Sequence, residues 1–335
     1  MFTKNDTVKC ILHNKNWKIT EKNAQAYAPS NIALAKYWGK RNAELNLPAN
    51  PSVSISLADK GATAIINTIP DPQDKFIINQ KNVFGNKHSA RLTQYLDLFR
   101  GPKPQFYQLE LQVNIPFAAG LASSACIFAS IILALNNLYA WQLKTHELSI
   151  LARLGSGSAA RSIQHGFVEW DKGIRDDGLD SFATLIPIRW SEFCVGLCIF
   201  ETKEKAVSSR EGMQHTEATS PFYADWVEYA NQSAGEIKSA ILQQDFLRLG
   251  ELAETNAATM HSTMLSANPP IRYHTQQTLD HIQQVKKLRQ TGLKVFYTQD
   301  AGPNLKLLFL SSDMESIKQH FSNIEIIQPF HAVSL

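Results

Sequence analysis

Alternation of apolar and polar positions predicts several short strands in the first part of the chain. β-Prone runs cover residues 31–35, 52–58 and 62–69, and Gly, Pro and Asn separate them, as in sheet strands joined by turns. Helical spacing follows from about Lys87 to Phe99. The most apolar stretch, Ala125 to Trp141, is interrupted by polar residues and is shorter than a membrane span, so it predicts a buried helix.

The later part of the chain mixes helices and strands without the regular alternation of a doubly wound sheet, so the predicted fold class is α+β. Helices are predicted for residues 145–153, 222–243 and 272–289, and strands for 167–171, 194–200, 295–300, 305–311 and 324–330. We expect the first ~20 residues to form a strand or loop laid on the body of the protein.

Chain length predicts two domains. A chain of 335 residues with 44% hydrophobic content can bury two cores of ordinary size. The apolar run from Cys194 to Phe200 is interpreted as the opening strand of the second core. The predicted division is therefore 1–190, of which 1–25 is an extension, and 191–335.

Charge and cysteine content argue against several classes of protein. The formal charge is +3, from 33 basic and 30 acidic residues with no block of five like charges, so neither a nucleic-acid tail nor a polybasic membrane anchor is expected. Four scattered cysteines are too few for a disulfide scaffold and favour a reducing cytoplasm. The first residues lack the apolar core of a secretory signal.

Two segments rich in small residues are candidates for anion binding. In residues 116–125, PFAAGLASSA, a glycine and small side chains precede the apolar helix, so backbone N–H groups and the helix dipole could cradle a phosphate. In residues 155–162, GSGSAARS, the hydroxyls of Ser156 and Ser158 accompany the planar guanidinium of Arg161. A serine-capped turn and a surface turn, respectively, are the alternatives, and neither segment is a Walker loop.

Three further segments carry charged side chains among turn residues. Residues 28–41 combine Lys36, Lys40 and Arg41 with aromatic side chains, which suits a polyanion or a solvated basic turn. Residues 207–213, preceded by Lys203 and Lys205, form a loop of hydroxyls and cations, and Asp300 ends a β-prone run where it could be catalytic or cap a turn. Ten dispersed histidines without HExxH, and the absence of GxSxG, argue against zinc and serine-hydrolase chemistry.

Together with residues 260–271, MHSTMLSANPPI, these segments resemble the diphosphomevalonate decarboxylase family of the GHMP kinase superfamily, from about Tyr27 almost to the end of the chain. The resemblance implies a two-domain GHMP kinase-like fold. Its N-terminal domain would be mixed α/β with a left-handed crossover, and its C-terminal domain would be ferredoxin-like. It also implies a homodimer, and, from the charge and the apolar pattern above, neither nucleic-acid nor membrane partners are expected.

The family reaction uses ATP and Mg²⁺ to phosphorylate the tertiary hydroxyl of mevalonate 5-diphosphate, then releases phosphate and carbon dioxide to leave isopentenyl diphosphate. The resemblance implies that Asp300 orients or deprotonates the hydroxyl. It implies that Lys36 and Arg161 hold the carboxylate and stabilise the departing phosphate. The nearest alternatives are a decarboxylase of mevalonate 5-phosphate, a mevalonate kinase and a non-catalytic ligand sensor of the same fold.

The resemblance also assigns the binding residues. Those that match the family's substrate site are Tyr37, Lys40, Ser156, Ser158, Lys205, Ser209, Arg210 and Met213. Those that match its nucleotide loop are Gly120, Leu121, Ala122, Ser123 and Ser124, and the Ser124 hydroxyl would also help to position the magnesium ion.

Overall fold

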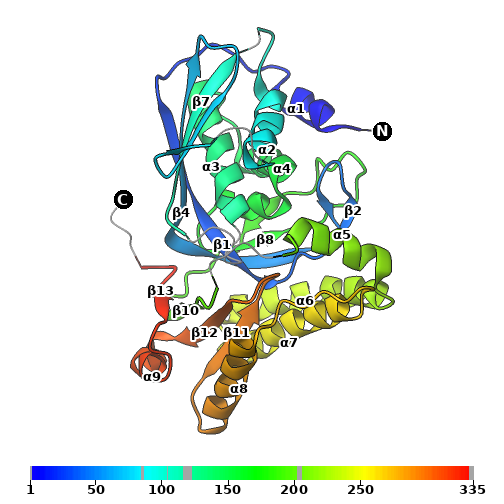
Figure 1. Cartoon of the computed structure of the whole chain (residues 1–335), viewed down its shortest axis with the longest axis vertical. Coiled ribbons are helices and arrows are strands. Elements are labelled where there is room, and N and C mark those ends of the chain that lie inside the picture. The colour runs from blue at the N-terminus through cyan, green and yellow to red at the C-terminus, as the bar shows by residue number, and fades with distance from the viewer. Residues whose placement is uncertain (1, 84–86, 104, 116–122, 202–205, 332–335) are drawn as a thin grey trace.

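Two sheets with helices packed on them make up the body of the protein (Figure 1). The computed structural model describes residues 2–83, 87–103, 105–115, 123–201 and 206–331. Within that part of the chain, the larger sheet has seven strands, the smaller has four, and a short hairpin forms a third. The mixture of sheets and helices confirms the predicted α+β class.

The larger sheet is organised around its longest strand, β4 (Ser52–Ile69), which pairs antiparallel with three neighbours. Residues 52–58 and 62–69, predicted as two strands, belong to this single strand. The strand runs through Gly61 without a break because glycine has no Cβ there. A Cβ at this position would come within 2.1 Å of the Ala28 carbonyl oxygen in the neighbouring strand. The other strands are β1 (Ala24–Ala35), β5 (Lys75–Ile78), β6 (Lys81–Asn82), β7 (Phe106–Val113), β8 (Phe167–Trp170) and β9 (Ala183–Leu185), in the order β6-β5-β7-β4-β8-β9 with β1 on β4.

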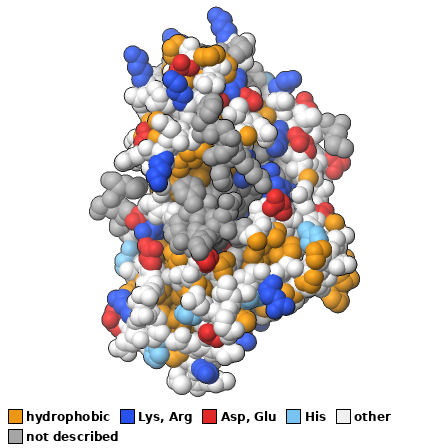
Figure 2. Space-filling view, viewed as in Figure 1, with side chains coloured by type: hydrophobic (Ala, Val, Ile, Leu, Met, Phe, Trp, Pro, Cys, Tyr) orange, Lys and Arg blue, Asp and Glu red, His pale blue; other side chains and the backbone are white. Residues whose placement is uncertain are grey.

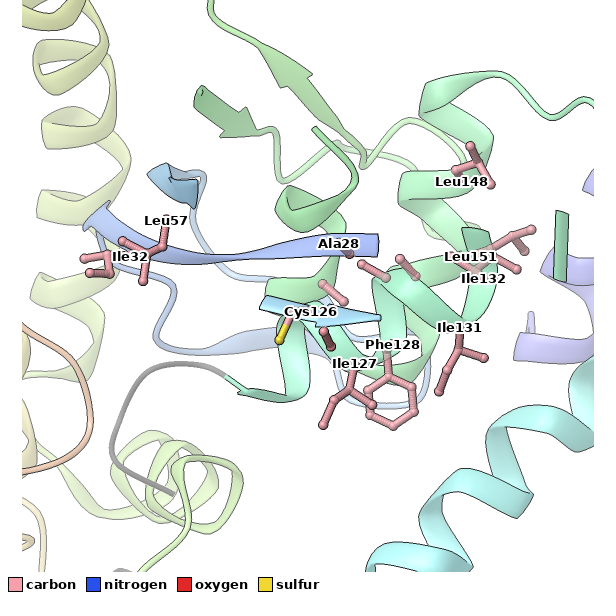
Figure 3. Close-up of a cluster of buried hydrophobic side chains, with 14 of the residues drawn as sticks. Ala28, Ile32, Leu57, Cys126, Ile127, Phe128, Ile131, Ile132, Leu148 and Leu151 are labelled. Carbon is pink, nitrogen blue, oxygen red and sulfur yellow. The ribbon is translucent and has the colours of Figure 1, made fainter. Parts of the chain in front are cut away.

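The apolar helix predicted after Ser124 packs on this sheet as α3 (Ser123–Leu138). Figure 3 shows its side chains in one cluster with Ala28, Ile32 and Leu57 of the sheet and with two leucines of α4 (Thr145–Gly155). Burial on nearly every side explains why most of its residues are apolar. The predicted helix from Lys87 is α2 (Lys87–Leu96), followed by a 3-10 turn, η1 (Asp97–Phe99).

The smaller sheet contains β10 (Phe193–Cys198), β11 (Val295–Gln299), β12 (Leu305–Leu310) and β13 (Glu325–Ile327) in the order β11-β12-β10-β13. All its neighbouring strands are antiparallel. Counted within the sheet, this is the 4-1-3-2 order of a ferredoxin-like domain, as expected. Its helices are α5 (Ser209–Thr219), α6 (Tyr223–Gln243), α7 (Phe246–Leu265), α8 (Gln276–Gln290) and α9 (Met314–His320).

The predicted strand or loop at the N-terminus is wrong, because residues Lys4–Leu12 form helix α1. Thr3 and Asp6 form a capping box at its start, and Val8 and Leu12, four residues apart, are buried on one face. The capping signal is present in the sequence and was missed. This helix lies beside the N-terminal half of the molecule in Figure 1.

Two segments predicted as loops are helical. Residues 157–163 form a 3-10 helix, η2 (Gly157–Ile163), and the loop predicted at residues 207–213 is mostly the first turn of α5. A capping box between Ser208 and Glu211 starts α5. The helix predicted from residue 272 begins only at Gln276, since Thr275 caps it.

Apolar packing is shared between the two sheets. The largest group of buried side chains runs from α3 into Val195 of β10, Leu249 of α7 and Leu308 of β12. The domain division at residues 190 and 191 therefore stays a prediction. No helix in the described ranges is long and apolar enough to span a membrane. Figure 2 shows apolar side chains grouped over the lower part of this face. Phe222, just before α6, and Leu265, at the end of α7, are among the exposed large apolar side chains of the C-terminal half.

Candidate active site

An aspartate held between two lysines lies at the centre of the candidate site. Lys36 follows the last residue of β1, and Asp300 follows the last residue of β11. The Lys36 Nζ is 2.7 Å from Asp300 Oδ1, and the Lys306 Nζ is 3.2 Å from Oδ2. Lys36 and Lys306 are 2% and 1% exposed, whereas the Asp300 side chain is 23% exposed. Both carboxylate oxygens therefore contact an ammonium group while the carboxylate keeps an open side.

The local electrostatics keep this carboxylate ionised. Burial acts to raise the pKa of Asp300, but the charges of Lys306 and Lys36 outweigh it and hold that pKa well below the ordinary range. Burial lowers the pKa of Lys36 to about 8, although Asp300 acts in the opposite direction. Near neutral pH the Asp300 carboxylate is thus a weak base that can accept a hydrogen bond from a ligand hydroxyl.

Arg161 lies near both members of this pair, because its charge lowers the pKa of Lys36 and the charge of Asp300 raises the pKa of Arg161. It is 3% exposed, and its guanidinium donates hydrogen bonds to Ser52 Oγ and, at 3.2 Å, to Asn31 Oδ1. Its buried Nε has no partner among the described residues. Burial lowers the pKa of Arg161 to about 10, so the group stays charged at neutral pH. A buried, charged and partly unsatisfied guanidinium favours an anionic ligand.

Tyr37 and a chain of hydroxyls lie next to this group. The Tyr37 ring packs edge-on against Trp170 with centroids 4.9 Å apart, and its buried hydroxyl lacks a partner within the described ranges. Burial raises the pKa of Tyr37, so the hydroxyl remains a donor. Ser156 Oγ is 3.1 Å from Ser124 Oγ and 3.3 Å from Ser158 Oγ, which joins the start of α3 to the start of η2.

Positive side chains form a second group around Lys40. The Lys40 Nζ donates to Asn46 Oδ1 at 2.7 Å, and Arg91 donates to the Gly155 carbonyl at 2.8 Å. Burial lowers the pKa of Lys40 to about 8, and repulsion from Arg210, Lys4 and Arg91 adds to this. Neither Lys40 nor Arg91 is ion-paired to a carboxylate in the described part of the chain. A ligand with several negative charges would relieve this repulsion.

The structure thus brings together most of the residues that the sequence singled out. Lys36, Asp300 and Arg161 are neighbours, although they come from three separate segments. Ser209 and Arg210 begin α5, and Met213 is 5% exposed and packs with Trp38 and Trp226. Four predicted residues lie outside the described residues: Gly120, Leu121, Ala122 and Lys205.

Sequence reasoning missed two of the cations. Lys306 interrupts the otherwise apolar strand LKLLFL, and a buried lysine in such a strand signals a charged partner. Arg91 lies within a helix with ordinary amphipathic spacing, so no local signal distinguished it from a surface residue. Only the fold reveals that it lies near Lys40 and Arg210.

A magnesium ion would depend on phosphate oxygens for most of its ligands. No group of three or more His, Cys, Asp or Glu that could hold a metal exists among the described residues, and both oxygens of Asp300 already contact lysines. The Ser124 hydroxyl, at the first turn of α3, offers a hard oxygen atom on the side of the site where a phosphate would meet the helix dipole. The donor set therefore fits a phosphate-bound magnesium ion and no protein-only site.

Comparison with known proteins gives matches along nearly the whole chain. Residues 28–183 match the diphosphomevalonate decarboxylase-like N-terminal domain, and residues 195–331 match the mevalonate 5-diphosphate decarboxylase C-terminal domain. The diphosphomevalonate decarboxylase of Aspergillus fumigatus is 36% identical over 316 residues, which cover 88% of this chain and 78% of that protein.

Solved structures agree with these matches. The crystal structure of mevalonate diphosphate decarboxylase from Staphylococcus aureus has a TM-score of 0.85 and 35% identity, covering 92% of this chain and 95% of that one. A complex of MDDEF with MVAPP, AMPPCP and magnesium has a TM-score of 0.83 and 37% identity, covering 90% of this chain and 95% of that one.

Proposed function

The chain belongs to the diphosphomevalonate decarboxylase family, and we propose that it converts mevalonate 5-diphosphate and ATP to isopentenyl diphosphate, ADP, phosphate and carbon dioxide. The observation that carries this proposal is the Asp300 carboxylate, fixed between Lys36 at 2.7 Å and Lys306 at 3.2 Å beside the buried Arg161. A ligand sensor would need no such set of opposed charges.

In the first step, Asp300 orients the tertiary hydroxyl of the substrate toward the γ-phosphoryl group of ATP. Its low pKa makes it a weak base, but phosphoryl transfer through a loose transition state depends mainly on positioning and charge stabilisation. Lys36 lies beside the same carboxylate and is placed to stabilise negative charge on the transferred phosphoryl group. The hydroxyl oxygen bonds to the γ-phosphorus as the bond to ADP breaks, and the hydroxyl proton leaves through Asp300 to solvent. The step replaces hydroxide, a poor leaving group, with phosphate, a good one.

In the second step, the C–O bond to the new phosphate breaks and the C–C bond to the carboxylate breaks with it. The electron pair of the C–C bond becomes the second bond of the alkene, and the phosphate leaves with the electrons of the C–O bond. Lys36 and Arg161 stabilise the departing phosphate and hold the carboxylate. The partly unsatisfied guanidinium of Arg161 supports this role.

The diphosphate binds at the positive group around Lys40. Repulsion among Lys40, Arg91 and Arg210 supports a ligand with several negative charges there. We assign substrate contacts to Tyr37, Lys40, Ser156, Ser158, Ser209, Arg210 and Met213. Lys205, outside the described residues, is proposed on the family match alone.

ATP is proposed to bind at the start of α3, where the helix dipole and backbone N–H groups suit phosphates. We assign it Ser123 and Ser124, and, on the family match, Gly120, Leu121 and Ala122. Magnesium, which the complex of MDDEF contains, would be held by Ser124 and phosphate oxygens and would neutralise phosphate charge during transfer.

Three organisational features are also proposals. The division into domains 1–190 and 191–335 is supported by the two sheets, whose strands lie on either side of it. A cytoplasmic location is supported by the four cysteines, all of them free. A homodimer is proposed on the family resemblance.

A panel of three substrates tests the function. The purified protein is incubated with ATP, magnesium and either mevalonate, its 5-phosphate or its 5-diphosphate, and ADP and carbon dioxide are measured separately. We expect equal release of both with the diphosphate. Preference for the 5-phosphate would indicate the related decarboxylase, ADP without carbon dioxide would indicate a kinase, and no turnover with any compound would favour a sensor.

A further inference from the structure

A short hairpin carries Lys40 into the site. It consists of β2 (Lys40–Asn42) and β3 (Leu47–Pro48), and Leu45 in its turn belongs to the largest group of buried apolar side chains. Asn46, the last residue of the turn, has a φ of 52°, in the left-handed region that asparagine adopts more readily than most residues. Asn46 is 2% exposed. A buried amide therefore lies in the same hairpin as the Lys40 ammonium.

The Asn46 amide joins Lys40 to the C-terminal end of α4. Its Oδ1 accepts a hydrogen bond from the Lys40 Nζ at 2.7 Å, and its Nδ2 donates to the carbonyls of Arg153 and Leu154 at 2.9 and 3.2 Å. This orientation of the amide is determined, since an ammonium group cannot accept a hydrogen bond and a carbonyl cannot donate one. The two carbonyls lie in the last turn of the helix, where intrahelical partners run out. The contact satisfies them and fixes the place of the ammonium.

A second cation is attached to the same helix end. Arg91 donates to the carbonyl of Gly155, the residue after Leu154, at 2.8 Å. The end of α4 thus holds the Arg91 guanidinium directly and the Lys40 ammonium through Asn46. Because a helix C-terminus bears a partial negative charge, it favours cations nearby. One helix end therefore sets the relative position of two cations of the site.

Asn46 holds Lys40 without neutralising it. An ammonium group has three N–H donors, and the Asn46 oxygen is the one acceptor of the Lys40 Nζ in the described ranges. A carboxylate in this place would form an ion pair with Lys40 and compete with an incoming anion. A neutral amide fixes the ammonium and leaves its charge available.

We propose that Asn46 is a positioning residue of the diphosphate subsite, which holds the Lys40 ammonium on the end of α4 and leaves its charge free for the diphosphate of the substrate. This inference rests on the proposed function, because the ligand of Lys40 is taken from it. Lys40 is assigned to the diphosphate and not to the reacting hydroxyl. The effect of Asn46 should therefore fall on KM and leave kcat nearly unchanged.

Two substitutions at Asn46 suit its backbone conformation. Asn46→Asp keeps the shape and offers Lys40 a carboxylate, and Asn46→Gly accepts a positive φ and removes the amide. We expect KM for mevalonate 5-diphosphate to rise about tenfold or more with Asp, because the new ion pair competes with the diphosphate, and about fivefold with Gly, because the ammonium loses its anchor. In both variants kcat should stay within about threefold of wild type. KM does not depend on the fraction of enzyme that is folded, so a loss of packing alone would leave it unchanged.

Asn23→Asp is the matched control. Asn23 also has a positive φ, of 55°, but it is exposed and precedes β1, whose 12 residues separate it from Lys36. The substitution changes the net charge by the same amount as Asn46→Asp. KM should stay at the wild-type value.

A double-mutant cycle with Lys40→Met tests whether Asn46 acts through Lys40. Once the ammonium is gone, Asn46→Gly should change KM by less than about 1.5-fold. Calorimetric titration with inorganic diphosphate measures the same subsite without turnover. Its affinity should fall in Asn46→Asp and Asn46→Gly and stay at the wild-type value in Asn23→Asp.

The outcomes separate the inference from the proposed function. A wild type that does not turn over mevalonate 5-diphosphate would contradict the proposed function, and the affinities for inorganic diphosphate then decide the role of Asn46. Unchanged KM and unchanged affinity for inorganic diphosphate in Asn46→Asp and Asn46→Gly would overturn the inference. An equal rise in KM for Asn46→Gly with and without Lys40 would also overturn it, and this comparison stands even if Asn46→Asp does not fold.

Discussion

Replacing Lys306 with methionine removes one of the two cations beside Asp300 and keeps a side chain of similar length. The two charges are 3.2 Å apart. Coulomb's law with an effective dielectric of ~20 gives about 5 kcal/mol for such a pair. Because the Asp300 side chain is 23% exposed, solvent screens part of this energy. The loss of the cation raises the pKa of Asp300, so the carboxylate becomes protonated at a higher pH.

The assay is the pH dependence of kcat/KM, which reports the free enzyme. In the wild type, activity that needs the Asp300 carboxylate is lost only well below the ordinary carboxyl range, because Lys306 and Lys36 hold its pKa down. If only a third of the ~5 kcal/mol interaction between Lys306 and Asp300 remains after screening, its loss in Lys306→Met still moves the low-pH loss of kcat/KM, the acid limb of the profile, upward by about one pH unit. Lys294→Met, at an exposed position before β11, is the control and should leave the profile unchanged. An acid limb that stays in place in Lys306→Met would refute the reasoning.

Three further outcomes follow from the structure. Burial lowers the pKa of Lys36 and of Lys40 to about 8, so kcat/KM should fall as the pH rises through about 8 and these ammonium groups become neutral. The value of kcat, measured with the anionic substrate bound, should fall only at higher pH. Leu12→Ala should destabilise the protein by about 2–4 kcal/mol in denaturant unfolding, since this side chain is 4% exposed, and leave kcat unchanged. Ser124→Ala should raise the magnesium concentration needed for half-maximal rate, and an unchanged requirement would exclude Ser124 as a ligand.

Regular elements with a strong periodic pattern could be predicted from the sequence. Examples are the apolar run that forms α3 and the β-prone runs in β4, β11 and β12. Each element is buried on one or both faces, and burial selects apolar residues at the positions on those faces. Helix α7 was missed because small and polar residues mix along it. Two of those polar residues, Asn256 and His261, are buried, at 0% and 4% exposed, which obscures the apolar stripe.

Charge and turn chemistry made Lys36, Arg161 and Asp300 candidates, each with an ordinary structural alternative, and their roles in the reaction are implied by the family resemblance. The lysine and arginine that complete the site, Lys306 and Arg91, lie on an ordinary strand and an ordinary helix. Their roles depend on pairings between distant segments, such as β11 with β12, which no local pattern reports. The resemblance therefore implied the reaction, whereas part of the electrostatic environment is visible only in the fold.

The most direct test of the central claim is a comparison of wild type with Asp300→Asn, using mevalonate 5-diphosphate and ATP with ADP and carbon dioxide measured together. The wild type should release one of each per turnover. The variant should lose both by on the order of 100-fold or more, because the hydroxyl is no longer oriented for transfer, while calorimetry still detects bound mevalonate 5-diphosphate. ADP and carbon dioxide released by Asp300→Asn at wild-type rates would contradict the account.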